Sequence, residues 1–135
     1  MKQEVAILVV DDELMMRQLL EKILSRDGYC VFCAANGEEA LAIMGREDIS
    51  IVISDLHMTG MSGFDLLNAI KKDHPQTGII MMTAYGDTYT VKDALLLGAD
   101  EYITKPFKSF EISMVVERAY WRLLSQSARQ AAEAD

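Results

Sequence analysis

The sequence has 135 residues, of which half are apolar, 25% are charged and only two are proline, so it predicts one folded domain and excludes a disordered chain. Thirteen basic and twenty-one acidic residues give a formal net charge of −8, which argues against direct contact with nucleic acid or an anionic membrane. Because no apolar run reaches the ~18–20 residues of a membrane span and the start is unlike a signal peptide, we expect a cytoplasmic protein.

Five short apolar runs alternate with five longer segments of helical periodicity. The runs, which we expect to form strands, are Val5–Val10, Tyr29–Ala34, Ile49–Ser54, Gly78–Met82 and Glu101–Thr104. Three of them contain the segments AILVV, ISIVI and GIIMM and are apolar almost throughout, as in strands that are covered on both faces of a parallel sheet.

Capping and turn residues delimit the expected helices. They are Gly28 after the first helix, Asn36 before the second, Ser62 before the third, His74 after it, Gly98 after the fourth (Thr88–Leu97) and Ser109 at the start of the fifth. Strict alternation of strand and helix predicts a doubly wound α/β domain with a five-stranded parallel sheet. We expect this domain to cover residues 4–124 and segment 125–135 to be a helix extension or a linker.

Cys30 and Cys33 form a CxxC pattern within an expected strand. Residues three apart on a strand point to opposite faces and lie roughly 10 Å apart. A disulfide tolerates at most ~7 Å between α-carbons, and two cysteines cannot complete a zinc site. We therefore interpret both residues as core cysteines.

Polar side chains follow the expected strands at one end of the sheet. Asp11 and Asp12 follow the first strand, Asp55 the third, Thr83 the fourth and Lys105 the fifth. Ligands bind outside the carboxyl ends of such strands. Three close carboxylates repel one another unless a cation lies among them, and oxygen-only ligands suit Mg²⁺. Each residue alone could be a cap, a turn former or a surface charge, but their convergence predicts a phosphoryl-transfer site with an aspartate nucleophile.

Four motifs at these positions carry a family resemblance. They are ILVVDDE (7–13), SDLHMTGMSGFDLL (54–67), MMTAYGD (81–87) and GADEYITKPF (98–107). With them the sequence resembles the response-regulator receiver domain of bacterial two-component signalling, over nearly the whole chain. The resemblance implies the CheY-like, flavodoxin-like (βα)5 fold with strand order 2-1-3-4-5. It also implies a phosphorelay role, in which a sensor histidine kinase or phosphotransfer protein supplies the phosphoryl group.

The resemblance assigns roles to the site residues. It makes Asp55 both the phospho-acceptor and a Mg²⁺ ligand. Asp12 is then a direct Mg²⁺ ligand, Asp11 a ligand through a metal-bound water and the backbone carbonyl of His57 a further ligand. Lys105 is expected to pair with the Asp55 carboxylate and then with the phosphoryl group. The side chain of His57 is more simply explained as a solvated loop residue, although it could influence how long the phosphoryl group survives.

The resemblance further implies a conformational switch. Thr83 is expected to move toward the phosphoryl group, with Tyr102 swinging inward to fill the vacated space. This changes the face of the fourth helix, fifth strand and fifth helix, which is expected to control an output domain or partner protein or to form a homodimer. Tyr85–Gly86 is expected to act as a hinge, and the side chain of Tyr85 to tune phosphoryl lifetime. Lys105–Pro106 is expected to be a cis peptide, and Thr59 stands where most members of the family have proline.

Two alternatives differ in function. A haloacid-dehalogenase-type phosphatase also uses aspartate, threonine, lysine and Mg²⁺, but its nucleophile leaves the first strand in a DxD pattern. Here the pair Asp11–Asp12 comes first and the late motif is KPF, which argues against an enzyme of that type. A degenerate receiver that only binds other proteins is disfavoured because every required side chain is present.

Overall fold

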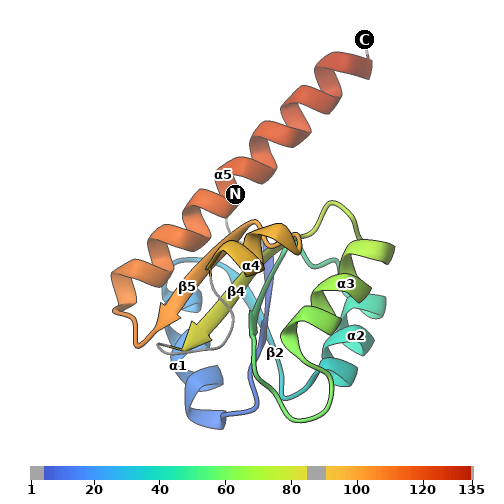
Figure 1. Cartoon of the computed structure of the whole chain (residues 1–135). Coiled ribbons are helices and arrows are strands. Elements are labelled where there is room, and N and C mark those ends of the chain that lie inside the picture. The colour runs from blue at the N-terminus through green and yellow to red at the C-terminus, as the bar shows by residue number, and fades with distance from the viewer. Residues whose placement is uncertain (1–4, 85–90, 135) are drawn as a thin grey trace.

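The computed structural model describes residues 5–84 and 91–134. Its centre is a parallel sheet of five strands in the order β2-β1-β3-β4-β5, which confirms the predicted fold class and strand order (Figure 1). The strands are β1 (Ala6–Val10), β2 (Cys30–Ala34), β3 (Ile51–Asp55), β4 (Gly78–Ala84) and β5 (Glu101–Lys105). Three strands extend one or two residues beyond their predicted ends, so Asp55, Thr83 and Lys105 belong to strand ends rather than to the following loops.

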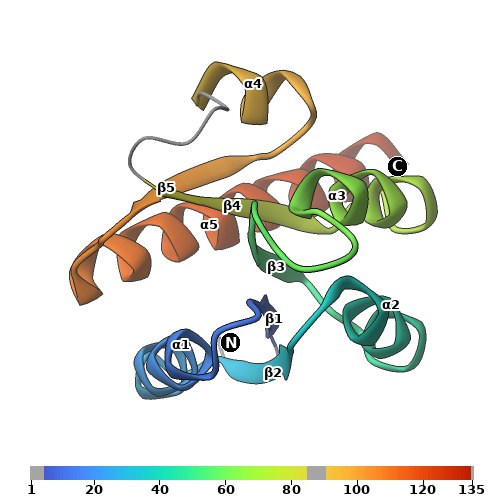
Figure 2. The ribbon, with the colours of Figure 1, turned by 60° about the horizontal axis from the view of Figure 1, so that its bottom comes forward.

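Two apolar layers pack on the sheet, one on each face. Alternate residues of each central strand face opposite layers, so that Leu8 and Val52 belong to one layer and Ile7 and Ile53 to the other. Figure 2 shows α2 and α3 on one side of the sheet and α1 and α5 on the other. This double cover explains why β1 and β3 are buried at every position.

The helices begin close to the predicted caps. They are α1 (Leu14–Arg26), α2 (Gly37–Arg46), α3 (Gly63–Asp73), α4 (Val91–Leu96) and α5 (Ser109–Ala134). Asn36 accepts a hydrogen bond from the backbone N–H of Glu39 at 2.8 Å, and Ser62 accepts one from that of Asp65 at 3.1 Å, so both predicted caps are confirmed. The predicted start of the fourth helix, Thr88, lies outside the described residues.

Helix α5 is the longest element, with 26 residues. Figure 1 shows that it continues well past the edge of the sheet. Two arginines anchor it to β5, because Arg118 and Arg122 each donate to the buried carboxylate of Glu101 at 2.7 Å. Within the described part of the chain, no helix has the length and apolar character needed to cross a membrane. The domain boundary at residue 124 stays a prediction.

Cys30 and Cys33 are both free cysteines. Their interpretation as core cysteines is wrong for Cys30, which is exposed, whereas Cys33 is half-buried. The physical reason is that β2 is an edge strand of the sheet and has less cover than β1 or β3.

Candidate functional site

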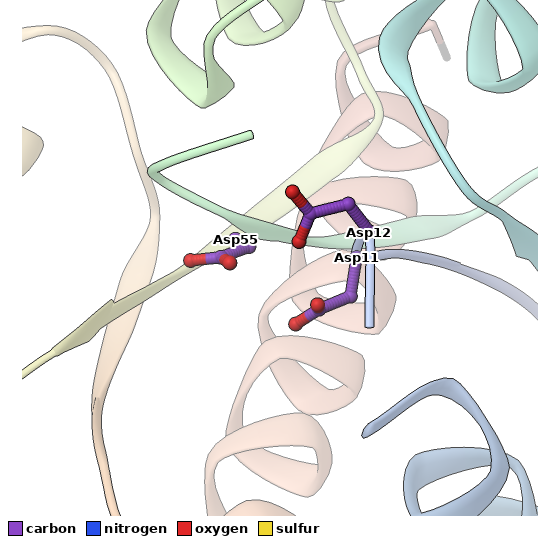
Figure 3. Close-up of side chains that lie close together, drawn as sticks. All are labelled: Asp11, Asp12 and Asp55. Carbon is purple, nitrogen blue, oxygen red and sulfur yellow. The ribbon is translucent and has the colours of Figure 1, made fainter. Parts of the chain in front are cut away.

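Three aspartates gather where β1 and β3 end (Figure 3). In the sheet register Val10 pairs with Ser54, so Asp11 and Asp55 are the next residues at the same edge. One carboxylate oxygen of each of Asp11, Asp12 and Asp55 lies within 4.8 Å of the others. The tertiary structure thus brings the three predicted carboxylates together.

The carboxylate of Asp11 is fully buried, and both of its oxygens accept hydrogen bonds from the protein. Oδ1 accepts from the backbone N–H of Glu13 at 2.9 Å, and Oδ2 accepts from Nζ of Lys105 at 3.0 Å. The backbone carbonyl of Asp11 accepts from Nη1 of Arg17 at 2.7 Å. Asp12, by contrast, is exposed. The two neighbouring aspartates therefore differ in how open they are to a ligand, and Asp12 is the more accessible.

Asp55 and Lys105 form the centre of the site. The Lys105 ammonium lies 3.3 Å from Asp55 Oδ2 and bridges Asp55 and Asp11. The backbone N–H of His57 donates to Asp55 Oδ1 at 3.4 Å. Burial raises the pKa of Asp55 and the Asp11 charge adds to this, while Lys105 opposes the shift without reversing it. Burial alone would lower the pKa of Lys105, but hydrogen bonds and charges from Asp11 and Asp55 outweigh it and raise that pKa.

The predicted switch residues occupy neighbouring strands. Thr83 is buried on β4, one residue beyond Met82, which pairs with Asp55 in the sheet register. Tyr102 lies on β5 and is 37% exposed. The predicted hinge, Tyr85–Gly86, lies outside the described residues.

The loop after β3 is held against the sheet by backbone hydrogen bonds. Leu56 donates to the carbonyl of Met82, and Gly63 donates to the carbonyl of Leu56, both at 2.9 Å. A Cβ atom added at Gly63 would overlap the main chain of Asp55 and Leu56, so glycine is required there for close approach. Thr59, which stands where proline was expected, is exposed in this loop. The Lys105–Pro106 peptide is cis, as the resemblance implied.

The donor set fits Mg²⁺. The cluster offers carboxylate oxygens from three aspartates. Together with Lys105, which bridges Asp11 and Asp55, these side chains carry a formal net charge of −2. Mg²⁺ prefers oxygen ligands, keeps several waters and is bound in proteins by one or two carboxylates together with phosphate oxygens. The exposed Asp12 leaves one side of the cluster open for those waters.

Arg17 is the site residue that the sequence analysis did not identify. Its contact is with the backbone carbonyl of Asp11, and a side chain one turn into a helix carries no motif that reveals such a contact. The only available signal was its position six residues after Asp11.

A protein-family model described as the response regulator receiver domain matches residues 7–117. The chain is 44% identical over 110 residues to the probable transcriptional regulator ycf27 of Porphyridium aerugineum, covering 82% of this chain and 45% of the relative. It is 37% identical over 112 residues to sporulation initiation phosphotransferase F of Bacillus subtilis, covering 83% and 90% respectively. The chain thus spans about half the length of the ycf27 relatives that it matches.

Solved structures give the same result. A response regulator receiver domain protein from Clostridium thermocellum matches with a TM-score of 0.82 and 35% identity, over 87% of this chain and 95% of its own. NtrX from Brucella abortus matches with a TM-score of 0.87 and 33% identity, over 96% of this chain and 29% of its own. The isolated receiver domain of NtrX covers 84% of this chain and 96% of its own, with a TM-score of 0.80 and 37% identity.

Proposed function

The chain belongs to the response regulator receiver domain family of two-component signalling, and from this premise we propose that Asp55 accepts a phosphoryl group from a histidine kinase or phosphotransfer protein. The observation that carries the proposal is the Lys105 ammonium, which bridges the carboxylates of Asp55 and Asp11 beside the exposed Asp12. A bridging cation next to an open carboxylate cluster suits an anion that arrives and leaves.

The proposed step is an in-line displacement at phosphorus. An oxygen of the Asp55 carboxylate forms the new O–P bond while the N–P bond of the phosphohistidine breaks, and the electron pair of that bond returns to the imidazole. The Lys105 ammonium, which lies 3.3 Å from Asp55 Oδ2, balances the negative charge of the incoming phosphoryl oxygens. Hydrogen bonds and charges from Asp11 and Asp55 raise the pKa of Lys105, which favours its protonated form in the resting site.

We further propose that Mg²⁺ is held by Asp12, Asp55 and the carbonyl of His57, with Asp11 acting through a metal-bound water. The ion, when bound, neutralises charge on the transferring phosphoryl oxygens. The two protein hydrogen bonds on the Asp11 carboxylate support its indirect role, since both oxygens already accept from Glu13 and Lys105.

The proposed output is a shift between two conformations. The phosphoryl group draws in the Thr83 hydroxyl, and Tyr102, now 37% exposed, packs into the space that Thr83 leaves. Moving such an equilibrium from 1:99 to 99:1 requires about 5.5 kcal/mol of preference for the active state. Two or three charge-assisted hydrogen bonds of ~1.5–3 kcal/mol each supply this amount.

We propose that the altered face of α4, β5 and α5 controls an output domain or a partner protein, a second copy of the chain included, and that the chain works in the cytoplasm. Receiver domains are signalling domains, and we propose that this one assists only its own phosphorylation and dephosphorylation. No observation favours the phosphatase alternative, because the acidic pair follows β1 and the single aspartate ends β3.

Intact-mass spectrometry after treatment with acetyl phosphate and Mg²⁺ tests the proposal, with Asp55→Asn as the matched variant. A base-labile phosphoryl adduct on the wild type alone is the expected result. An adduct on both proteins would mean that another residue is the acceptor. The absence of an adduct in either protein, with Mg²⁺ binding confirmed by calorimetry, would instead indicate a degenerate receiver.

A further inference from the structure

The backbone carbonyl of Asp11 lies just beyond the sheet, and its hydrogen bond comes from a helix side chain. Val10 is the last residue of β1 that pairs with the neighbouring strands, with Ala34 on one side and Ser54 on the other. Asp11 is fully buried, so a carbonyl at this place without a donor would be costly. Arg17 provides the donor, because its Nη1 lies 2.7 Å from the carbonyl oxygen.

Arg17 reaches this carbonyl because of its place in α1. It is the fourth residue of that helix and is half-buried. Side chains of a helix slope toward its N-terminus, so the guanidinium extends back over the first turn to the end of β1. The contact thus joins α1 to the strand end that carries two aspartates of the cluster.

Helix stability and surface charge do not explain an arginine at this position. Acidic residues are favoured near the N-terminus of a helix and basic residues are not, yet the first turn of α1 contains no acidic residue. An ordinary partner for Arg17 would be Glu21, one turn further along the helix. Glu21 Oε2 instead accepts a hydrogen bond from Cys33 Sγ at 3.8 Å, and the guanidinium turns back to Asp11.

Hydrogen bonds hold every polar group of Asp11. Its backbone N–H donates to the carbonyl of Ala34 at 3.2 Å. Its two carboxylate oxygens accept from the N–H of Glu13 and from Lys105. Arg17 binds the remaining group, the backbone carbonyl. Asp11 is therefore fixed in both its side chain and its backbone.

Asp12 is held only through its backbone. Its carboxylate is exposed, and no group of residues 5–84 and 91–134 donates a hydrogen bond to it. The peptide group that joins Asp11 to Asp12 is planar. The bond that fixes the Asp11 carbonyl therefore also fixes the direction in which Asp12 leaves the chain. Figure 3 shows both side chains at the end of β1, close to Asp55.

We propose that Arg17 is a positioning residue for the Mg²⁺ site. By holding the peptide between Asp11 and Asp12, it keeps the Asp12 carboxylate directed at the cluster. The inference rests on the proposed function, in which Asp12 is a direct ligand. Without this restraint the carboxylate turns outward, because the three aspartates repel one another. Partners that orient metal ligands typically contribute about 10–100-fold to metal affinity.

The charge of Arg17 acts in the opposite direction. A positive charge near the cluster repels a divalent cation, so its removal alone would tighten Mg²⁺ binding. If Arg17 acts through the Asp11 carbonyl, its removal weakens Mg²⁺ binding. The two effects differ in sign, so the change in Kd shows which one dominates.

Titration of the metal-free whole chain with Mg²⁺, followed by NMR of the backbone amides, tests the proposal. Arg17→Met removes the donor but keeps side-chain length and helix propensity, and we expect it to raise the Kd for Mg²⁺ about tenfold or more. Lys22→Met is the matched control, because it removes a positive charge from an exposed position of the same helix. It should leave the Kd unchanged within about twofold, since exposed charges are screened. Urea unfolding checks that both variants are folded under the conditions of the titration.

The Mg²⁺ dependence of phosphorylation by acetyl phosphate gives a second readout. Arg17→Met should need about tenfold more Mg²⁺ for its half-maximal rate and should reach the wild-type rate at saturation, within about twofold. A variant that is merely less folded would instead lose maximal rate without a change in the Mg²⁺ midpoint.

An unchanged or lower Kd in Arg17→Met, or an equal rise in Lys22→Met, would overturn the inference. A wild type that binds no Mg²⁺ would overturn the metal site and the inference together. A wild type that binds Mg²⁺ but accepts no phosphoryl group would overturn the proposed function alone, because the Kd values of the wild type and Arg17→Met would still decide the role of Arg17.

Discussion

Replacing Asp55 with asparagine is expected to make the metal-free domain more stable, by about 1–2 kcal/mol. The substitution keeps the size of the side chain and a carbonyl oxygen that Lys105 can still bind. It removes one negative charge from a buried cluster of three carboxylates. The residue proposed to accept the phosphoryl group is thus one that destabilises the resting fold.

The magnitude follows from the distances around Asp55. At an effective dielectric constant of about 20, the Lys105 ammonium at 3.3 Å contributes about 5 kcal/mol of attraction. Oxygens of Asp11 and Asp55 lie within 4.8 Å of each other, so the repulsion from Asp11 is about 3.5 kcal/mol or more, and repulsion from the exposed Asp12 is about 1–3.5 kcal/mol depending on solvent screening. The attraction and the repulsion nearly cancel. The cost of burying the Asp55 carboxylate therefore decides whether its charge raises or lowers the free energy of unfolding. The raised pKa of Asp55, caused first by burial, agrees with a net penalty for the charged form.

Urea unfolding at pH 7.5 in EDTA measures the effect, and a gain of this size corresponds to about 3–7 °C in Tm. Asp48→Asn is the control, because Asp48 is an exposed aspartate outside the cluster, and should change stability by less than about 0.5 kcal/mol. Mg²⁺ at ten times its Kd should then stabilise the wild type by about 1.4 kcal/mol and Asp55→Asn by less.

An Asp55→Asn variant that is less stable than the wild type in EDTA would refute this reasoning. It would mean that the Lys105 ion pair outweighs both the burial of the Asp55 carboxylate and its repulsion from Asp11. The reasoning would also fail if high salt, which screens exposed charges, removed the difference completely, because the penalty for burying the Asp55 carboxylate does not depend on salt.

Three further outcomes are expected. Gly63→Ala should destabilise the fold by more than about 2 kcal/mol, because the added Cβ meets main-chain atoms. Gly45 has open space around it within a helix, so Gly45→Ala should leave stability unchanged or raise it. Urea unfolding of the two variants distinguishes these outcomes. Burial raises the pKa of Tyr29 to about 12, which favours the protonated phenol in the fold. Stability is therefore unaffected below pH 10, and the wild type should lose roughly 2–3 kcal/mol relative to Tyr29→Phe between pH 10 and 12; equal pH profiles would contradict this. Burial also raises the pKa of Cys33 to about 11, so iodoacetamide at pH 8 should label exposed Cys30 at least tenfold faster, as peptide mass spectrometry can show.

Much of the site could be predicted because parallel strands place their ends together. Once alternating runs identified β1, β3 and β5, the residues at their ends had to meet at one edge of the sheet. The capping pairs at Asn36 and Ser62 were equally readable, since the interaction spans only three residues. These features depend on local periodicity, which short stretches of sequence show, and on general rules of sheet topology.

Other features required the packed structure. The two aspartates that follow β1 look alike in sequence, yet Asp11 is fully buried with both oxygens bonded, whereas Asp12 is exposed. The difference depends on Lys105, which is 94 residues away from Asp11 along the chain. The contact of Arg17 with the Asp11 carbonyl could not be predicted either, because any residue supplies a backbone carbonyl and no sequence motif marks the contact.

The sequence by itself determined the order of strands and helices, the caps and the identity of the residues at the strand ends. The tertiary structure decided which of those residues are buried and which faces stay open. Cys30 is exposed because β2 is an edge strand, and Trp121 is exposed because the opposite face of α5 covers the sheet. Burial is set by distant elements that pack against a residue, so a local pattern can show that a helix is apolar on two faces but not which face the core takes.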